Sequence, residues 1–156
     1  MNKQNIILIG MPGAGKSSVG VILAKVLGYE FIDTDLVIQH REKRLLREII
    51  ADEGNEGFLA IENEVNATLE ADKSVIAPGG SAIYGKEAME HFKEIGTIVY
   101  LKLSYEDLAK RLGNLKGRGV VLKEGQTLKD LYDERSKLYE QYAEITVDES
   151  LSLIHI

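Results

Sequence analysis

Residues 10–17 read Gly10-Met11-Pro12-Gly13-Ala14-Gly15-Lys16-Ser17, and this stretch of the 156-residue chain decides the predicted fold. Its pattern, G-x-x-x-x-G-K-[ST], is typical of a loop that binds phosphate groups through its backbone. The apolar run 6–9 before the loop predicts a buried parallel strand. Apolar residues at helical spacing follow it and predict a helix that ends at Gly28; they are Val19, Ile22, Leu23, Val26 and Leu27.

The loop and the start of the helix form the predicted nucleotide site. Glycines allow backbone N–H groups to turn inward, and the positive end of the helix adds to their attraction for phosphate. Lys16 would place a charge near the β and γ phosphates, and the Ser17 hydroxyl would bind Mg²⁺. The predicted set is Gly13, Ala14, Gly15, Lys16, Ser17 and Ser18. The alternative is a glycine-rich turn with a chance Lys-Ser pair.

Composition limits the classes of function. The net charge of -6 argues against a broad nucleic-acid interface. The absence of cysteine excludes disulfides, thiolate catalysis and zinc-thiolate sites. The sequence contains no apolar run long enough for a membrane span and shows no signal peptide. The chain is long enough for one domain with a single core. We therefore expect a monomeric cytoplasmic enzyme with a small-molecule substrate.

Strands and helices alternate along the chain, which predicts an α/β fold with a parallel sheet and one domain over 1–150. Expected strands cover 30–33, 75–77, 97–103 and 145–147. A helix is expected over 36–51, with a break near Glu42, and another over 58–69, after an interruption at Gly54. Further helices are expected at 86–93, as a polar surface helix, and at 105–112. The last expected helix begins at Thr127, with Asp130 as its capping-box acid. Residues 113–125 are expected to form a mobile loop.

The final six residues, 151–156, are interpreted as a non-native tail. They match what a common sequencing-library adapter encodes, and they are too few to form a terminal helix. A genuine short tail is the alternative.

Two acids follow the second predicted strand. Asp33 and Asp35 are spaced to lie on the same side of a strand end, where ligands of parallel sheets bind. We assign Asp33 to Mg²⁺ and Asp35 to a substrate hydroxyl, whose proton it would accept during phosphoryl transfer. In the alternative interpretation, Asp33 or Thr34 only caps the next helix.

Gly79-Gly80-Ser81 follows the next strand, and its paired glycines would allow a ligand to approach the backbone; a plain turn fits equally well. Arg135 falls on the apolar stripe of its helix, so an anion should meet it. Either an internal carboxylate or a substrate carboxylate would serve. Arg118 in the glycine-rich loop could reach the phosphates or remain solvated. Arg111 could face the nucleotide base or lie on the surface.

Together these segments resemble the shikimate kinase family. The matching features are the loop 10–17, the run Phe31-Ile-Asp-Thr-Asp35, Phe58 with Glu62, Pro78-Gly-Gly80, Arg118, and Glu134-Arg135 with Leu138-Tyr139. The resemblance covers residues 6 to about 148. It implies a P-loop NTPase fold of the nucleoside-monophosphate-kinase type, a three-layer sandwich around a five-stranded parallel sheet. It also implies a lid at about 113–125 and substrate-binding helices at about 34–62.

The resemblance further implies ATP, Mg²⁺ and transfer of the γ-phosphoryl group to the 3-hydroxyl of shikimate. By match, Lys16 and Ser17 serve the phosphates and the metal, and Asp35 meets the shikimate hydroxyls. Gly79 and Gly80 belong to the substrate site, Arg135 binds the carboxylate, and Arg118 is the lid arginine.

The chain departs from the family pattern at three places. Leu59 stands where the family has an arginine that clamps the substrate carboxylate, Ser81 replaces a third glycine, and Arg118 is followed by Gly119-Val120-Val121 instead of Pro-Leu-Leu. Losing one charge-assisted bond would cost on the order of 1.5–3 kcal/mol. Leu59 therefore favours the first alternative, a kinase of another small alcohol such as homoserine. The second alternative is a nucleotide-binding protein without catalytic activity.

Overall fold

The computed structural model describes residues 4–113 and 125–149. Within them, five strands form one parallel sheet in the order β2-β3-β1-β4-β5. The strands are β1 (Asn5–Ile9), β2 (Glu30–Asp33), β3 (Ser74–Ala77), β4 (Gly96–Lys102) and β5 (Ile145–Asp148). The expected strands and their parallel arrangement are confirmed.

The helices are α1 (Lys16–Leu27), α2 (Thr34–Glu42), α3 (Leu46–Ala67), α4 (Lys86–Ile95), α5 (Tyr105–Gly113) and α6 (Leu128–Tyr142), with a short 3₁₀ turn, η1 (Ala82–Tyr84). The break near Glu42 and the interruption at Gly54, which has φ 75°, are confirmed. The capping box of Thr127 and Asp130 at the start of α6 is also present. Among the described helices, none is long and apolar enough to cross a membrane.

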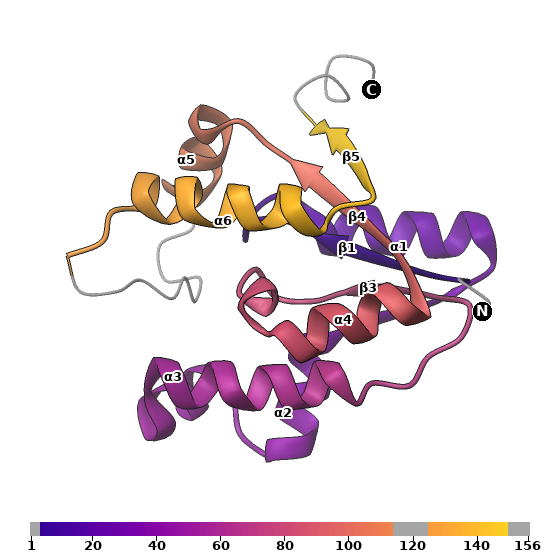
Figure 1. Cartoon of the computed structure of the whole chain (residues 1–156), viewed down its shortest axis with the longest axis horizontal. Coiled ribbons are helices and arrows are strands. Elements are labelled where there is room, and N and C mark those ends of the chain that lie inside the picture. The colour runs from indigo at the N-terminus through magenta and orange to yellow at the C-terminus, as the bar shows by residue number, and fades with distance from the viewer. Residues whose placement is uncertain (1–3, 114–124, 150–156) are drawn as a thin grey trace.

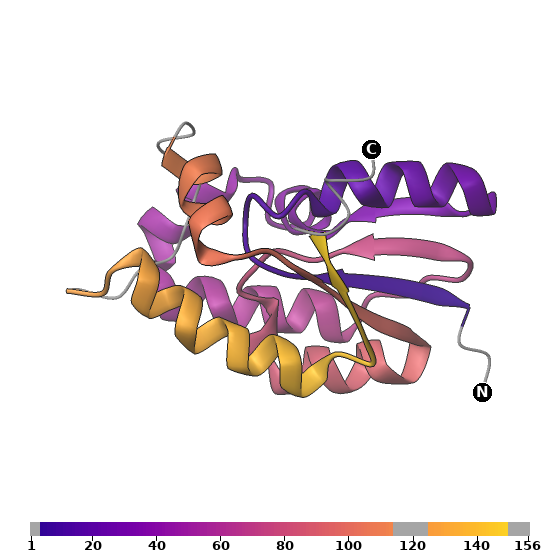
Figure 2. The same cartoon turned by 90° about the horizontal axis from the view of Figure 1, so that it is seen from above.

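The sheet is covered on both faces, which makes three layers (Figure 1, Figure 2). Alternate residues of β1 point to opposite sides, so Ile7 and Ile9 join the core under α4 and α6, while Leu8 joins the core under α1. Figure 2 shows α1 on one side of the strands and α4 with α6 on the other. Helix α3 packs beside α4 and forms a third, smaller apolar cluster with α2.

Two helices present different faces from those that their sequences predicted. Helix α1 contacts the sheet through Gly20 and Ala24, and Ile22 and Val26 are exposed. Small residues occupy the face of α1 that contacts the sheet because they allow the helix to lie close to the strands. Helix α4, expected to be a polar surface helix, buries Ala88, Met89 and Phe92 in the main core. Its three apolar residues at i, i+1 and i+4 form a narrow stripe that is sufficient for packing.

The strand register aligns the polar ends of three strands. Asp33 pairs with Ala77 across β2 and β3, and Ile7 of β1 pairs with Ile76 of β3. The phosphate loop, the start of α2 and the segment 78–80 therefore leave the sheet at the same edge, where ligands of open parallel sheets bind.

We expect Gly20→Val to lower the free energy of unfolding by about 1–3 kcal/mol. A Cβ at Gly20 would lie 2.5 Å from Cε1 of the Phe31 ring and 3.3 Å from Cδ1 of Leu8, so α1 must move away from the sheet. Val26→Ala, on the exposed side of the same helix, is the control and should stay within about 0.5 kcal/mol. Chemical denaturation measures both; equal stability of the two variants would contradict the packing described for α1.

Candidate active site

The phosphate loop connects β1 to the N-terminus of α1. Gly13 and Gly15 have φ of 89° and 82°, a left-handed conformation that other residues adopt only with strain. The Ala14 N–H donates to Met11 O, which closes the loop, and the Val19 N–H donates to Gly15 O as α1 begins. Ser17 and Ser18 are exposed at this helix end. The loop therefore has the backbone shape that binds anions at a helix N-terminus.

Lys16 reaches back across the loop. Its Nζ donates to Gly10 O at 2.9 Å and to Met11 O at 3.0 Å. Burial lowers the pKa of Lys16 to about 8; Asp35 opposes this shift, and Arg135 adds to it. The ammonium is thus held by neutral carbonyl groups inside a poorly solvated site.

Arg111 lies against the phosphate loop, on α5. Its Nη1 donates to Gly13 O at 3.0 Å and lies 3.8 Å from Oε2 of Glu149, just after β5. Burial raises the pKa of Glu149, while Arg111 and Lys16 oppose the shift. The Arg111 side chain is half-buried against the loop, and its contact with a nucleotide stays a prediction. Glu149 was not anticipated.

Asp33 and Asp35 occupy different elements. Asp33 is the last residue of β2 and the N-cap of α2, because its Oδ1 accepts the Asp35 N–H at 2.9 Å. Asp35 lies in the first turn of α2, so the expectation that both side chains project from one strand end is wrong. The chain turns into a helix at Thr34, and the capping role weighed for Asp33 is real. The second oxygen of Asp33 takes no part in that capping bond.

Asp35 faces the segment after β3. A Cβ built on Gly79 would lie 3.0 Å from Oδ1 of Asp35, so only glycine lets the carboxylate come this close to the backbone. Burial, together with the charge of Asp33, raises the pKa of Asp35 to about 6, and the charge of Lys16 opposes this shift. Asp35 is therefore ionised at neutral pH and lies in a poorly solvated position.

Arg135 is 1% exposed and reaches the same segment from α6. Its Nη1 would lie 2.9 Å from a Cβ on Gly80, and its guanidinium carbon lies 5.6 Å from the centre of the Tyr84 ring. Among the described residues Arg135 forms no ion pair, and its Nε has no hydrogen-bond partner. Within that part of the chain, the internal carboxylate weighed as its partner is not found. Gly80 O in turn accepts from the Tyr139 hydroxyl at 2.6 Å.

A buried acid, Glu62, lies at the same segment, and the sequence motifs assigned it no role. Glu62 of α3 is 1% exposed, and its Oε1 accepts from the Ser81 hydroxyl at 2.7 Å. Its Oε2 would lie 3.1 Å from a Cβ on Gly79, on the same side as Asp35. The signal was available, because Glu62 lies four residues after Phe58 on the apolar stripe of α3. Arg118 and the rest of the predicted loop at 114–124 lie outside the described residues.

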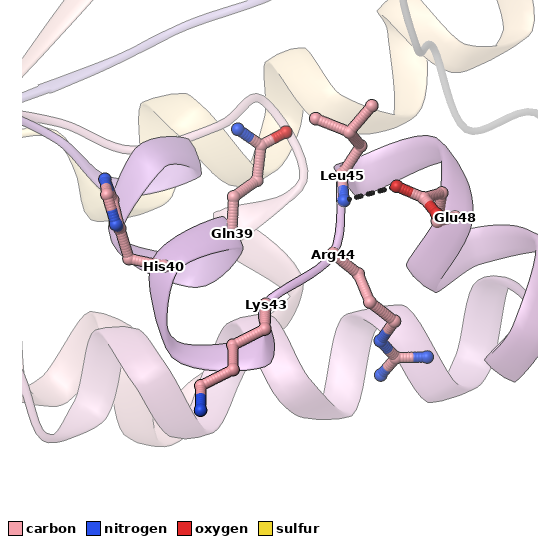
Figure 3. A pocket seen from close by; sticks show the side chains of 6 residues that line it. All are labelled: Gln39, His40, Lys43, Arg44, Leu45 and Glu48. Atoms are coloured by element: carbon pink, nitrogen blue, oxygen red, sulfur yellow. Dashed lines mark hydrogen bonds between the residues drawn. The ribbon is translucent and has the colours of Figure 1, made fainter.

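An open hollow of about 320 Å³ lies elsewhere, where α2 joins α3 (Figure 3). Its lining includes His40, Lys43 and Arg44, but the Arg44 guanidinium already pairs with Glu42, Asp52 and Glu53. A hydrogen bond from the Leu45 N–H to Glu48 fixes the start of α3 at its rim. The hollow contains no residue of the phosphate loop and is not part of the candidate site.

The donor set fits a nucleotide-bound Mg²⁺ better than a metal held by protein alone. Among the described residues, no group of three or more His, Asp or Glu could hold a metal ion. Mg²⁺ that is bound to nucleotide phosphates needs only one or two protein oxygens as ligands and keeps several waters. The Ser17 hydroxyl and the Asp33 carboxylate are compatible with that smaller demand.

Comparison with known proteins agrees with this arrangement. A family model described as shikimate kinase matches residues 12–154. Shikimate kinase 2 of Yersinia enterocolitica is 34% identical over 154 residues, which cover 93% of this chain and 86% of the relative. The chain belongs to the shikimate kinase family. This family consists of ATP-using phosphotransferases that act on an alcohol group, and the family resemblance predicted from the sequence is confirmed.

Solved shikimate kinases share the fold. The enzyme from Acinetobacter baumannii, in complex with shikimate, has a TM-score of 0.82 and 35% identity, covering 94% of this chain and 84% of its own. The enzyme from Aquifex aeolicus has a TM-score of 0.73 and 33% identity, covering 92% and 85%. The predicted P-loop fold of the nucleoside-monophosphate-kinase type is confirmed.

We expect Tyr139→Phe to lower the free energy of unfolding by about 1–3 kcal/mol, because it leaves the buried Gly80 carbonyl without its donor. Tyr142→Phe, on a half-buried tyrosine in the last turn of the same helix, should change stability by less than about 0.5 kcal/mol. Denaturant titration compares the two, and equal losses would mean that the hydroxyl of Tyr139 does not support the segment 79–80.

Proposed function

We propose that this member of the shikimate kinase family transfers the γ-phosphoryl group of ATP to the 3-hydroxyl of shikimate. One observation carries the proposal: the phosphate loop, Asp35 and Arg135 converge at Gly79 and Gly80 on a single edge of the sheet. A phosphate-binding surface, a half-buried base and a guanidinium that has no carboxylate partner among the described residues are what a hydroxy acid and ATP require. The solved relative in complex with shikimate supports the same acceptor.

Each residue has a proposed task. Backbone N–H groups of Gly13, Ala14 and Gly15 cradle the phosphates, and Lys16 exchanges its carbonyl partners for phosphate oxygens. Asp35 receives the hydroxyl proton as the oxygen attacks phosphorus. Arg135 binds the acceptor carboxylate with charge-assisted hydrogen bonds, and Gly80 brings backbone into contact with it.

The nucleotide side is completed by residues from three regions. Arg111 lies close enough to the loop to contact the bound nucleotide, and we place Ser18 beside the phosphates as well. Mg²⁺, held by Ser17 and through water by Asp33, would neutralise the charge on the phosphates. We assign Arg118 to a lid within 113–125 and the acceptor-binding helices to 34–62. The monomeric state and the cytoplasmic location stay predictions.

A second acceptor is favoured by one residue. Leu59 of α3 packs with the apolar cluster of Ile38, Ile49 and Phe58, so it offers the acceptor no charge. Arg135 is then the cation available to an acceptor carboxylate from the described part of the site. The alternative substrate is another small alcohol, such as homoserine, that needs fewer positive charges from the protein.

Release of ADP across a panel of acceptors tests the proposal. We expect turnover with shikimate and much less with homoserine, gluconate or nucleoside monophosphates. If Leu59→Arg raises the rate with shikimate, the acceptor site is weakened but unchanged in kind. Turnover with another alcohol only, and no gain from Leu59→Arg, would refute shikimate as the substrate.

We expect Asp35→Asn to lower kcat by at least about 100-fold while ATP binding changes little, because the amide cannot accept the hydroxyl proton. Asp72→Asn, an exposed residue between α3 and β3, is the control and should leave kcat within twofold. A coupled ADP assay and equilibrium binding of ATP measure the two effects. Activity of Asp35→Asn close to that of the unmodified chain would exclude Asp35 as the base.

A further inference from the structure

The carboxyl group of Glu62 is the least explained polar group of the site. Its Oε1 accepts a hydrogen bond from the Ser81 hydroxyl at 2.7 Å. Its Oε2 is buried and has no hydrogen-bond partner among the described residues. A buried carboxyl oxygen without a partner is costly, so a proton, a ligand or both should meet it.

The second oxygen of Glu62 lies beside Gly79, on the same side as Asp35. A single point, the Cβ position built on Gly79, lies 3.1 Å from Oε2 of Glu62 and 3.0 Å from Oδ1 of Asp35. The neighbouring point on Gly80 lies 2.9 Å from Nη1 of Arg135. Two acids from different helices and one guanidinium therefore meet at two consecutive residues.

Three neighbouring groups, two of them charged, influence the ionisation of Glu62. Asp35 of α2 disfavours the ionised form of Glu62, and Arg135 of α6 and the Ser81 hydroxyl favour it. Burial is the largest influence and raises the pKa of Glu62 to about 7. Residue 59, one helical turn earlier, is a leucine and brings no positive charge. Near neutral pH a large share of Glu62 is therefore a neutral acid.

The hydrogen bond from Ser81 determines where the proton lies. Oε1 accepts that bond, so the proton of the neutral acid belongs on Oε2, which faces Asp35 and Gly79. In this form Glu62 is a donor placed beside an ionised acceptor, Asp35. Such a pair can hold an alcohol that donates its hydroxyl proton to Asp35 and presents a second oxygen to Glu62.

We propose that Glu62 binds the acceptor in its protonated form, donating from Oε2 to an oxygen next to the reacting hydroxyl. Acceptor binding then takes up a proton from solvent whenever Glu62 is ionised beforehand. The preferred acceptors carry a second hydroxyl or a carboxylate oxygen beside the reacting group. This inference rests on the proposed function, because it assumes that Asp35 and Arg135 line the acceptor site.

Proton uptake on binding tests the inference directly. Shikimate is titrated calorimetrically into the full chain at pH 7.5, in two buffers that differ in protonation enthalpy. We expect about 0.8 proton taken up per shikimate bound, the ionised share of an acid with a pKa of about 7. Affinity should fall roughly 15-fold between pH 7.0 and 8.5.

Two variants assign the proton to Glu62. Glu62→Gln keeps a donor but cannot titrate, so we expect it to weaken binding several-fold and to abolish both the proton uptake and the pH dependence. Ser81→Ala removes the bond that favours the ionised acid, so the midpoint of the pH dependence should move upward. Glu90→Gln, on the exposed side of α4 and outside the acceptor-binding helices, is the matched control and should behave as the unmodified chain.

Several results would overturn the inference. They are proton uptake that persists in Glu62→Gln, affinity that does not change from pH 6.5 to 8.5 in the unmodified chain, or a midpoint that Ser81→Ala does not move. If Glu62→Gln fails to fold, the unmodified chain and Ser81→Ala still give the last two results. Absence of shikimate binding at every pH would refute the proposed function instead. The titration is then repeated with whichever acceptor supports ADP release, and a flat profile there overturns the inference about Glu62.

Discussion

The parallel pairing of β1, β2 and β3 is the constraint on which the site depends. Parallel strands end at the same edge of a sheet, so three turns that are distant in sequence leave the sheet side by side. The first turn carries Lys16, the second Asp35, and the third the pair Gly79-Gly80. None of these residues would meet the others without that register. Helix α6 then crosses the same edge on one face of the sheet and adds Arg135.

Much of the fold followed from local patterns in the sequence. Buried parallel strands are continuous apolar runs, and loop residues interrupt them clearly, so the strands were predicted nearly to the residue. The faces of helices were predicted less well. Helix α1 carries more large apolar residues outside than inside, because Gly20 and Ala24 let it approach Phe31 and Leu8 closely. Apolar periodicity does not reveal a helix that packs through its small residues.

The site residues also fall into those that local sequence patterns predicted and those that they did not. The phosphate loop and the run that contains Asp35 are each short continuous stretches of sequence. Their chemistry could be predicted because residues that are adjacent in the sequence are also close in space. The bond from Ser81 to Glu62 joins residues 19 apart, and that from Arg111 to Gly13 joins residues 98 apart. Such pairs depend on tertiary packing and leave only a weak trace, a charged residue on an apolar stripe. That trace was used for Arg135, whereas Glu62 was noted only as part of the family pattern and was given no role.

The electrostatics of the site explain why it needs two anionic ligands. Lys16 and Arg135 repel each other; Arg135 is buried and Lys16 is half-buried. Asp35, close to Lys16, offsets only part of this charge because burial and Asp33 raise its pKa as well. The carbonyl groups that hold Lys16 are weaker partners than phosphate oxygens, and the Tyr84 ring beside Arg135 is a weaker partner than a carboxylate. A polyphosphate on one side and an acid on the other therefore satisfy both cations, and the hydroxyl between them is left next to Asp35.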